Sequence, residues 1–192
     1  MTTNPHLTGH DEAMKQVTEA FASGRMHHAW LMVGAEGIGK GTLAMHIANH
    51  VLSSGQNPLG RIDLQHRITK LIMADAHPDM LTIRRPIDDK TGEQKNIIPV
   101  EEALKIAAFL RKTSTHGGWR VVVIDEAHAL NRNGQNAILK ILEEPPTQAL
   151  ILMTATTPGA LLPTIRSRSR VLHMAPLDDA QMKSILMKTQ PD

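Results

Sequence analysis

A glycine-rich segment near the start of the chain has the spacing of a phosphate-binding loop. It runs from Gly34 to Lys40, reads GAEGIGK and fits the pattern G-x-x-x-x-G-K. Gly34, Gly37 and Gly39 let backbone N–H groups converge on phosphate oxygens, and Lys40 adds a positive charge. An apolar run precedes the loop and a segment with helical spacing follows it, as the pattern requires. We therefore predict a nucleotide-phosphate site, the alternative being a plain glycine-rich turn.

The residue after Lys40 departs from this pattern. A serine or threonine hydroxyl ordinarily ligates Mg²⁺ there, whereas this chain has Gly41 followed by Thr42. One step along a helix rotates a side chain by about 100°, so the Thr42 hydroxyl is expected to point away. Gly41 and Thr42 complete the candidate nucleotide-binding residues, and we expect ATP with Mg²⁺ to bind weakly or unproductively.

Two carboxylates follow a later apolar run. Residues 121–124 read VVVI and are followed by Asp125 and Glu126. In phosphoryl transfer the aspartate holds Mg²⁺ and the glutamate orients or polarises the attacking water. The same pattern also occurs where a strand ends in solvent, but here it lies downstream of a phosphate loop. We therefore take Asp125 and Glu126 as candidate catalytic residues.

Threonine hydroxyls follow the apolar run 150–153. Thr154, Thr156 and Thr157 lie at its tip, beside the predicted phosphate site. The hydroxyls either face that site or form a turn, and both interpretations stay open from the residues alone.

Three arginines alternate before the last apolar run. They are Arg166, Arg168 and Arg170, which point the same way if the backbone is extended. The resulting cationic edge is either a solvated surface or the source of an arginine finger, which one subunit offers to a phosphate on its neighbour.

The composition restricts the function classes. The chain has 192 residues, 41% hydrophobic and 2% aromatic, with a formal net charge of +2, too balanced for a general polyanion binder. It has no cysteine, which excludes disulfides, thiolate catalysis and cysteine zinc sites. His46 and His50 share a helix face without a third ligand, so we expect no metal site. Without a signal peptide or membrane-length apolar run, we expect a cytoplasmic protein with no membrane partner.

The motifs must be positioned by alternating strands and helices. Apolar runs predict strands at 29–33, 80–83, 121–124, 150–153 and 171–173. Helical spacing predicts helices at 11–22, 42–52, 64–74, 100–110, 136–142 and 178–187. This alternation predicts a three-layer α/β fold of P-loop type with a five-stranded parallel sheet. Ligands of such sheets bind at the carboxyl ends of the strands, where the motifs fall.

The motifs together resemble those of AAA+ clamp-loader subunits of bacterial DNA polymerase III, most closely the delta-prime type. The resemblance extends over nearly the whole chain and is carried by the segments 24–30, 77–79, 117–127, 136–146 and 162–169. The string LKILEEPP, within 136–146, is highly specific.

The resemblance implies a loader that opens a ring-shaped sliding clamp and places it on primed DNA, with ATP bound between subunits. The implied partners are the gamma/tau and delta subunits, the sliding clamp and, through the assembled complex, primed DNA. Ser167-Arg168-Ser169 stands where the family has Ser-Arg-Cys, so Arg168 is the implied finger in trans. Thr156, rather than Thr157, is the implied first sensor, and Gly9-His10 falls near the adenine.

Three departures from the family refine this expectation. Gly41 favours a weakly or non-hydrolysing stator of delta-prime type, the alternatives being an active gamma/tau-type ATPase and a P-loop enzyme outside replication. The region 56–77, which carries a four-cysteine zinc module in relatives, has no cysteine, so no zinc is expected. We expect a nucleotide-binding-type domain over 1–175 and the start of a truncated helical lid over 176–192.

Overall fold

Five parallel strands form the centre of the molecule. The computed structural model describes residues 7–88, 90–115 and 117–189. Its sheet has the strand order β2-β3-β4-β1-β5, so β1 lies between two partners from the second half of the chain. The strands are β1 (Ala29–Val33), β2 (Met80–Ile83), β3 (Arg120–Ile124), β4 (Ala149–Ala155) and β5 (Arg170–His173).

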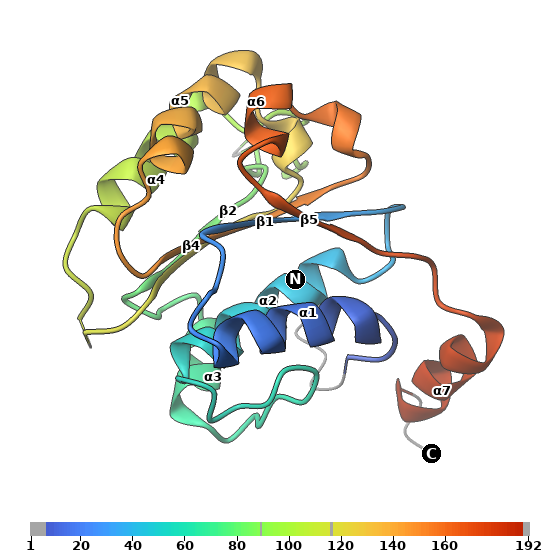
Figure 1. Cartoon of the computed structure of the whole chain (residues 1–192). Helices are drawn as coiled ribbons and strands as arrows, with labels where there is room; N and C mark the ends of the chain where they lie inside the picture. The colour runs from blue at the N-terminus through green and yellow to red at the C-terminus, as the bar shows by residue number, and fades with distance from the viewer. Residues whose placement is uncertain (1–6, 89, 116, 190–192) are drawn as a thin grey trace.

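Helices cover both faces of this sheet (Figure 1). On one face lie α1 (Asp11–Ala22), α2 (Lys40–Leu52) and α3 (Arg67–Met73). On the other lie α4 (Val100–Leu110), α5 (Arg132–Glu143) and the short α6 (Pro163–Arg166). The chain also forms the single turns η1 (Ala127–Ala129) and η2 (Pro158–Ala160), and ends in α7 (Asp179–Thr189).

The core is divided into two layers by the alternation of strand side chains. In β3, Val122 and Ile124 pack with the α4–α5 layer, whereas Val121 and Val123 pack with the α1–α2 layer. Every residue of β1, β3 and β4 is buried, as expected for central strands with helices on both faces. Their carboxyl ends are thereby fixed side by side.

The predicted fold class is confirmed, and most predicted elements lie where the sequence indicated. Two differences matter for the site. Strand β4 extends to Ala155, which places Thr154 inside the sheet rather than at a free tip. The extended arrangement of the three arginines is wrong, because Arg166 ends α6 while Arg170 begins β5. Pro163 begins this single turn, where its fixed φ suits the first position of a helix.

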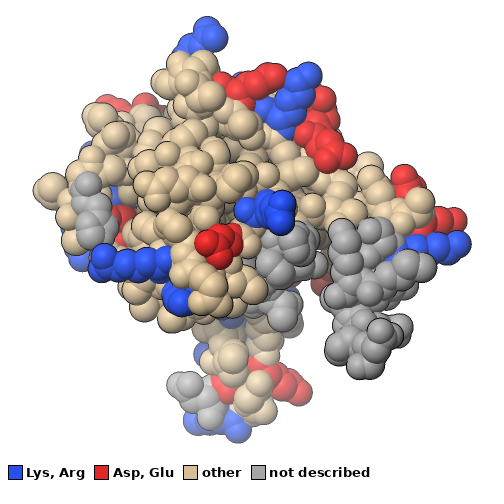
Figure 2. All heavy atoms as spheres, turned by 90° about the horizontal axis from the view of Figure 1, so that it is seen from below, with Lys and Arg blue, Asp and Glu red and all other residues tan. Residues whose placement is uncertain are grey.

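The face that carries α1 to α3 has a mixed charge (Figure 2). Positive and negative side chains are interspersed there, and neither sign forms a continuous band. In the described part of the chain, no helix is both long enough and apolar enough to cross a membrane.

Candidate functional site

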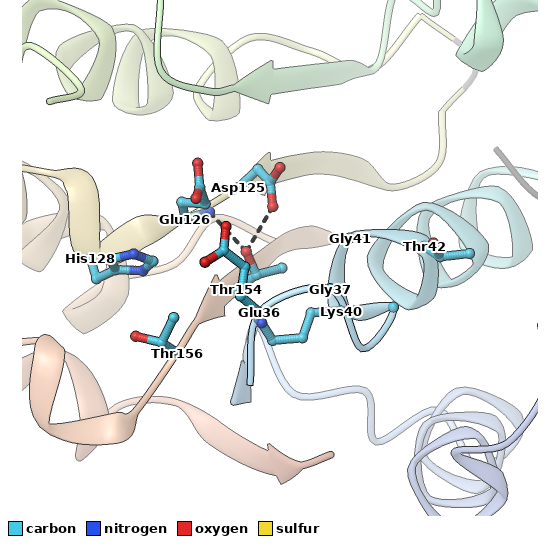
Figure 3. Close-up of a pocket in the computed structure, with 11 residues that line it drawn as sticks. Glu36, Gly37, Lys40, Gly41, Thr42, Asp125, Glu126, His128, Thr154 and Thr156 are labelled. Atoms are coloured by element: carbon cyan, nitrogen blue, oxygen red, sulfur yellow. Dashed lines mark hydrogen bonds between the residues drawn. The ribbon is translucent and has the colours of Figure 1, made fainter. Parts of the chain in front are cut away.

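The carboxyl ends of β1, β3 and β4 meet at a cavity of about 280 Å³ (Figure 3). It brings together the phosphate loop, the two carboxylates and the predicted sensor, while Arg168 lies elsewhere. Its lining residues are Glu36, Gly37, Gly39, Lys40, Gly41, Thr42, Asp125, Glu126, His128, Thr154 and Thr156.

The loop backbone uses conformations that favour glycine. Gly37 has φ 78° and Gly39, which precedes the first turn of α2, has φ 98°. Gly34 does not line the cavity but packs beneath it: a Cβ there would lie 2.4 Å from the carbonyl oxygen of Met174. The loop therefore needs glycine at these positions, because Gly37 and Gly39 have positive φ and Gly34 has no room for a side chain.

Lys40 is folded back onto the loop. Its Nζ donates hydrogen bonds to the carbonyl oxygens of Gly34, at 2.9 Å, and Ala35, at 2.6 Å. Burial lowers the pKa of the Lys40 ammonium, although the negative charge of Asp125 acts in the opposite direction. The ammonium has three N–H donors, and two of them already bond the loop itself.

One threonine hydroxyl connects the two carboxylate residues. Thr154 Oγ1 donates to Asp125 Oδ1 at 2.8 Å and accepts from the backbone N–H of Glu126 at 2.8 Å (Figure 3). Ile124 pairs with Met153, so Asp125 follows directly opposite Thr154. Sequence reasoning named Thr154 only as one of three hydroxyls near the strand tip, because this contact depends on the register between β3 and β4. Thr156 lines the cavity beside His128.

Glu126 is held in an ion pair that sequence reasoning missed. Arg85 Nε lies 2.5 Å from Glu126 Oε2, and Arg85 Nη2 donates to Oε1 at 3.0 Å. Arg85 follows β2, which neighbours β3, so the sheet topology brings the two side chains together. Both carboxylate oxygens of Glu126 therefore have a partner before any water could approach.

The metal side of the cavity is poorly equipped. Gly41 offers no side chain, and Figure 3 shows Thr42 on the part of α2 turned away from Asp125 and Glu126. One oxygen of Asp125 already accepts from Thr154. The residues present therefore fit a polyphosphate, through the loop, better than they fit Mg²⁺.

A second, more apolar cavity of about 430 Å³ adjoins the phosphate loop. Segments from both ends of the described chain line it, including Leu7, Ile38, Leu177 and Met182. His10 lies next to this cavity, with Nε2 2.8 Å from the carbonyl oxygen of Ile38. Such a cavity beside a phosphate loop could hold an apolar ring.

The three arginines have separate environments. Arg168 Nη2 lies 2.9 Å from Glu143 Oε1, and its Nη1 donates to the carbonyl oxygen of Thr164 at 3.0 Å. The guanidinium of Arg170 lies 5.0 Å from the centre of the Trp30 ring. They therefore do not form the single cationic edge predicted from an extended backbone.

Comparison with known proteins identifies DNA polymerase III subunits as relatives of this chain. A family model described as DNA polymerase III, delta subunit, matches residues 9–178. DNA polymerase III subunit delta' of Pseudomonas aeruginosa is 35% identical over 153 residues, which are 80% of this chain and 44% of that protein. The Escherichia coli delta' is 31% identical over 84% of this chain and 46% of its own length. The tau subunit of Salmonella typhimurium is 30% identical over 92% of this chain and 26% of its own length.

Solved structures share the fold. A DNA polymerase III gamma subunit-related protein of Thermotoga maritima has a TM-score of 0.60 and 16% identity, covering 91% of this chain and 49% of that one. The Thermotoga maritima RuvB Holliday junction branch migration motor has a TM-score of 0.59 and 23% identity, covering 97% of this chain and 53% of that one. These likenesses confirm the predicted three-layer α/β fold. The chain spans less than half the length of the curated relatives it matches.

Proposed function

The chain belongs to the DNA polymerase III delta-subunit family, and from this premise we propose that it is the nucleotide-binding-type domain of a delta-prime-type clamp-loader subunit. In this role it works in the cytoplasm with gamma/tau and delta subunits to load the sliding clamp onto primed DNA. Residues 1–175 form this domain, and residues 176–192 begin a helical lid.

The proposed subunit is a stator that hydrolyses ATP weakly or not at all. The observation that carries this proposal is the pairing of both Glu126 carboxylate oxygens with Arg85. A glutamate in such a bidentate pair is not free to polarise water, and general-base catalysis is worth about 10²–10⁴-fold in rate. Gly41 removes the hydroxyl ligand of Mg²⁺ in addition.

ATP is the proposed ligand, bound through its phosphates at the loop and with its adenine in the adjoining apolar cavity. Mg²⁺ bound with ATP would neutralise phosphate charge, but Gly41 offers it no hydroxyl, and the one remaining candidate ligand, Asp125, already accepts a hydrogen bond from Thr154. A cysteine zinc site cannot form, because the chain has no cysteine. Thr156 is proposed as the sensor of bound nucleotide.

Arg168 is proposed as an arginine finger for a neighbouring ATPase subunit. Arg168 lies outside the cavity of its own chain, and its side chain is 34% exposed. An arginine in that position is suited to bind a phosphate across a subunit boundary.

The deciding experiment reconstitutes the full-length subunit with gamma/tau, delta, the clamp and primed DNA. We expect Arg168→Ala to lower the DNA-stimulated ATPase rate without preventing assembly. Arg132→Ala removes an exposed positive charge from the start of α5 and is the matched control. Unchanged ATPase activity in Arg168→Ala would remove the finger from the mechanism.

Nucleotide turnover by the subunit alone distinguishes the stator from an active gamma/tau-type ATPase. We expect little turnover in the natural chain, and tighter Mg-ATP binding by Gly41→Ser in isothermal titration. Equal affinities of the two chains would contradict the role assigned to Gly41. Robust turnover that Glu126→Gln abolishes would favour the gamma/tau-type alternative.

A further inference from the structure

The guanidinium of Arg168 is held by acceptors from two parts of the chain. Nη1 donates to the carbonyl oxygen of Thr164 at 3.0 Å and to Ser167 Oγ at 3.3 Å, both within the turn that carries Arg168 itself. Nη2 lies 2.9 Å from Glu143 Oε1, at the end of α5. Among the described contacts of this guanidinium, the one to Glu143 alone fixes it relative to another element.

Glu143 stands on a well-anchored helix end. The carbonyl oxygen of the preceding residue, Leu142, lies 3.0 Å from Nε2 of His28, which directly precedes β1. Carbonyls in the last turn of a helix lack intrahelical partners, so this contact ties the end of α5 to the sheet. The Leu142 side chain is buried, and the N–H of Glu144 donates to the carbonyl oxygen of Lys140. The Glu143 backbone therefore has little freedom to move.

The turn that carries Arg168 is attached to the same helix at a second point. Gln135 Oε1 accepts from the N–H of Leu162 at 2.9 Å, and Gln135 Nε2 donates to the carbonyl oxygen of Leu130 at 3.1 Å. Ile165 of α6 is fully buried in the same layer as α5. Thus α5 holds the segment 162–168 through Gln135 near its start and Glu143 at its end.

We infer that Glu143 is a positioning residue for Arg168, an inference that rests on the proposed role of Arg168 as a finger. A guanidinium has five N–H donors; in Arg168 the Nη1 group makes both hydrogen bonds, and Nη2 forms the ion pair with Glu143. Nε–H has no acceptor among the described residues. An N–H of a charged guanidinium suits a phosphate oxygen. Glu143 therefore restricts the side chain while Nε–H stays available to a phosphate of the neighbouring subunit.

The test uses the full-length subunit in the reconstituted loader with clamp and primed DNA. Glu143→Gln keeps the shape of the side chain and removes its charge. Because misplacing a reacting group lowers the rate more than it weakens binding, we expect kcat for ATP to fall about 3–10-fold. KM for ATP should stay within about twofold. Glu144→Gln makes the same change at the adjacent exposed carboxylate, which has no described contact with Arg168, and should leave kcat unchanged.

A double variant separates positioning from a general loss of structure. In the Arg168→Ala background, Glu143→Gln should cause no further loss, whereas an additive loss would overturn the inference. A kcat unchanged by Glu143→Gln would also overturn it, as would a lower KM, which would mean that Glu143 competes with the phosphate. If Arg168→Ala itself leaves the rate unchanged, the finger and this inference both fail. A loss in Arg168→Ala with a normal Glu143→Gln overturns this inference alone.

Discussion

The Thr154 hydroxyl makes two hydrogen bonds within the site. It is buried, it donates to Asp125, and it accepts from the N–H of Glu126. Thr154→Val keeps the shape and removes both bonds, which leaves the Glu126 N–H without its described acceptor. We expect the free energy of unfolding to fall by about 1–3 kcal/mol, measured by urea denaturation.

The control for this change is Thr156→Val. Thr156 also lines the cavity, but it is only partly buried, so its replacement should cost less than about 0.5 kcal/mol. Equal losses in the two variants would show that the hydrogen bonds of Thr154 contribute nothing specific.

Residue types and spacing predicted the loop and the acidic pair but not their partners. Gly34 to Lys40, Asp125 and Glu126 belong to local patterns that a sequence displays directly. Arg85 and Glu126 are 41 residues apart, and their contact depends on β2 lying beside β3. Thr154 was one of several hydroxyls near a strand end, and only the register with β3 distinguishes it from Thr156. The sequence therefore indicates which residues could carry out the chemistry, but it does not indicate which side chains bind to them.

At the scale of elements, the phosphate loop is packed against the chain that leaves β5. A Cβ on Gly34 would meet the backbone oxygen of Met174 at 2.4 Å, and a backbone atom cannot move aside as a flexible side chain can. We expect Gly34→Ala to lower the free energy of unfolding by about 1–3 kcal/mol in urea denaturation.

Gly118→Ala provides the comparison for the loop. Gly118 has no neighbour within 4 Å of an added Cβ and no positive φ, so its change should stay within about 0.5 kcal/mol. A Gly34→Ala protein as stable as Gly118→Ala would mean that the loop is free to shift from β5.

The junction between α5 and β1 should respond to pH through His28. Burial lowers the pKa of His28, and the adjacent His27 lowers it further. Below the ordinary histidine pKa of about 6.5, the unfolded chain therefore binds a proton that the folded chain resists, so stability falls as pH falls from there toward the folded pKa. His28→Gln should show a smaller loss of melting temperature than the natural chain between about pH 7.5 and about pH 5.5.

The same change at His173, an exposed residue at the end of β5, controls for general effects of removing a histidine. His173→Gln should keep the acid dependence of the natural chain. If both variants lose stability with acid just as the natural chain does, His28 does not contribute to that dependence.

The long helices with a clear period were predictable from the sequence, whereas the short helix α6 was not. The helices Asp11–Ala22 and Val100–Leu110 have the bounds that their spacing predicted. The turn α6 has four residues, too few to display a period, and its location depends on Gln135 and buried Ile165. Arg168 therefore had to be positioned by tertiary contacts that its own alternating pattern did not reveal.

At the scale of the whole molecule, α7 is loosely attached. None of its described side chains is buried. A chain that ends at Asp178 should therefore keep its free energy of unfolding within about 1 kcal/mol, measured by urea denaturation. A larger loss would contradict the proposed boundary near residue 176 and make α7 part of the first domain.

The strand order also determines how late the sheet can be completed. Strand β1 pairs with β4 from Ala29↔Ile151 onward and with β5 from Trp30↔Arg170 onward. During synthesis its five apolar residues are made early, yet both neighbours are missing until residues 149–173 have been added. Contacts this distant in sequence slow folding, and an unpaired apolar strand is prone to aggregate. The nascent chain must therefore carry this inner strand uncovered, or protected by a chaperone, until residues 149–173 have been translated.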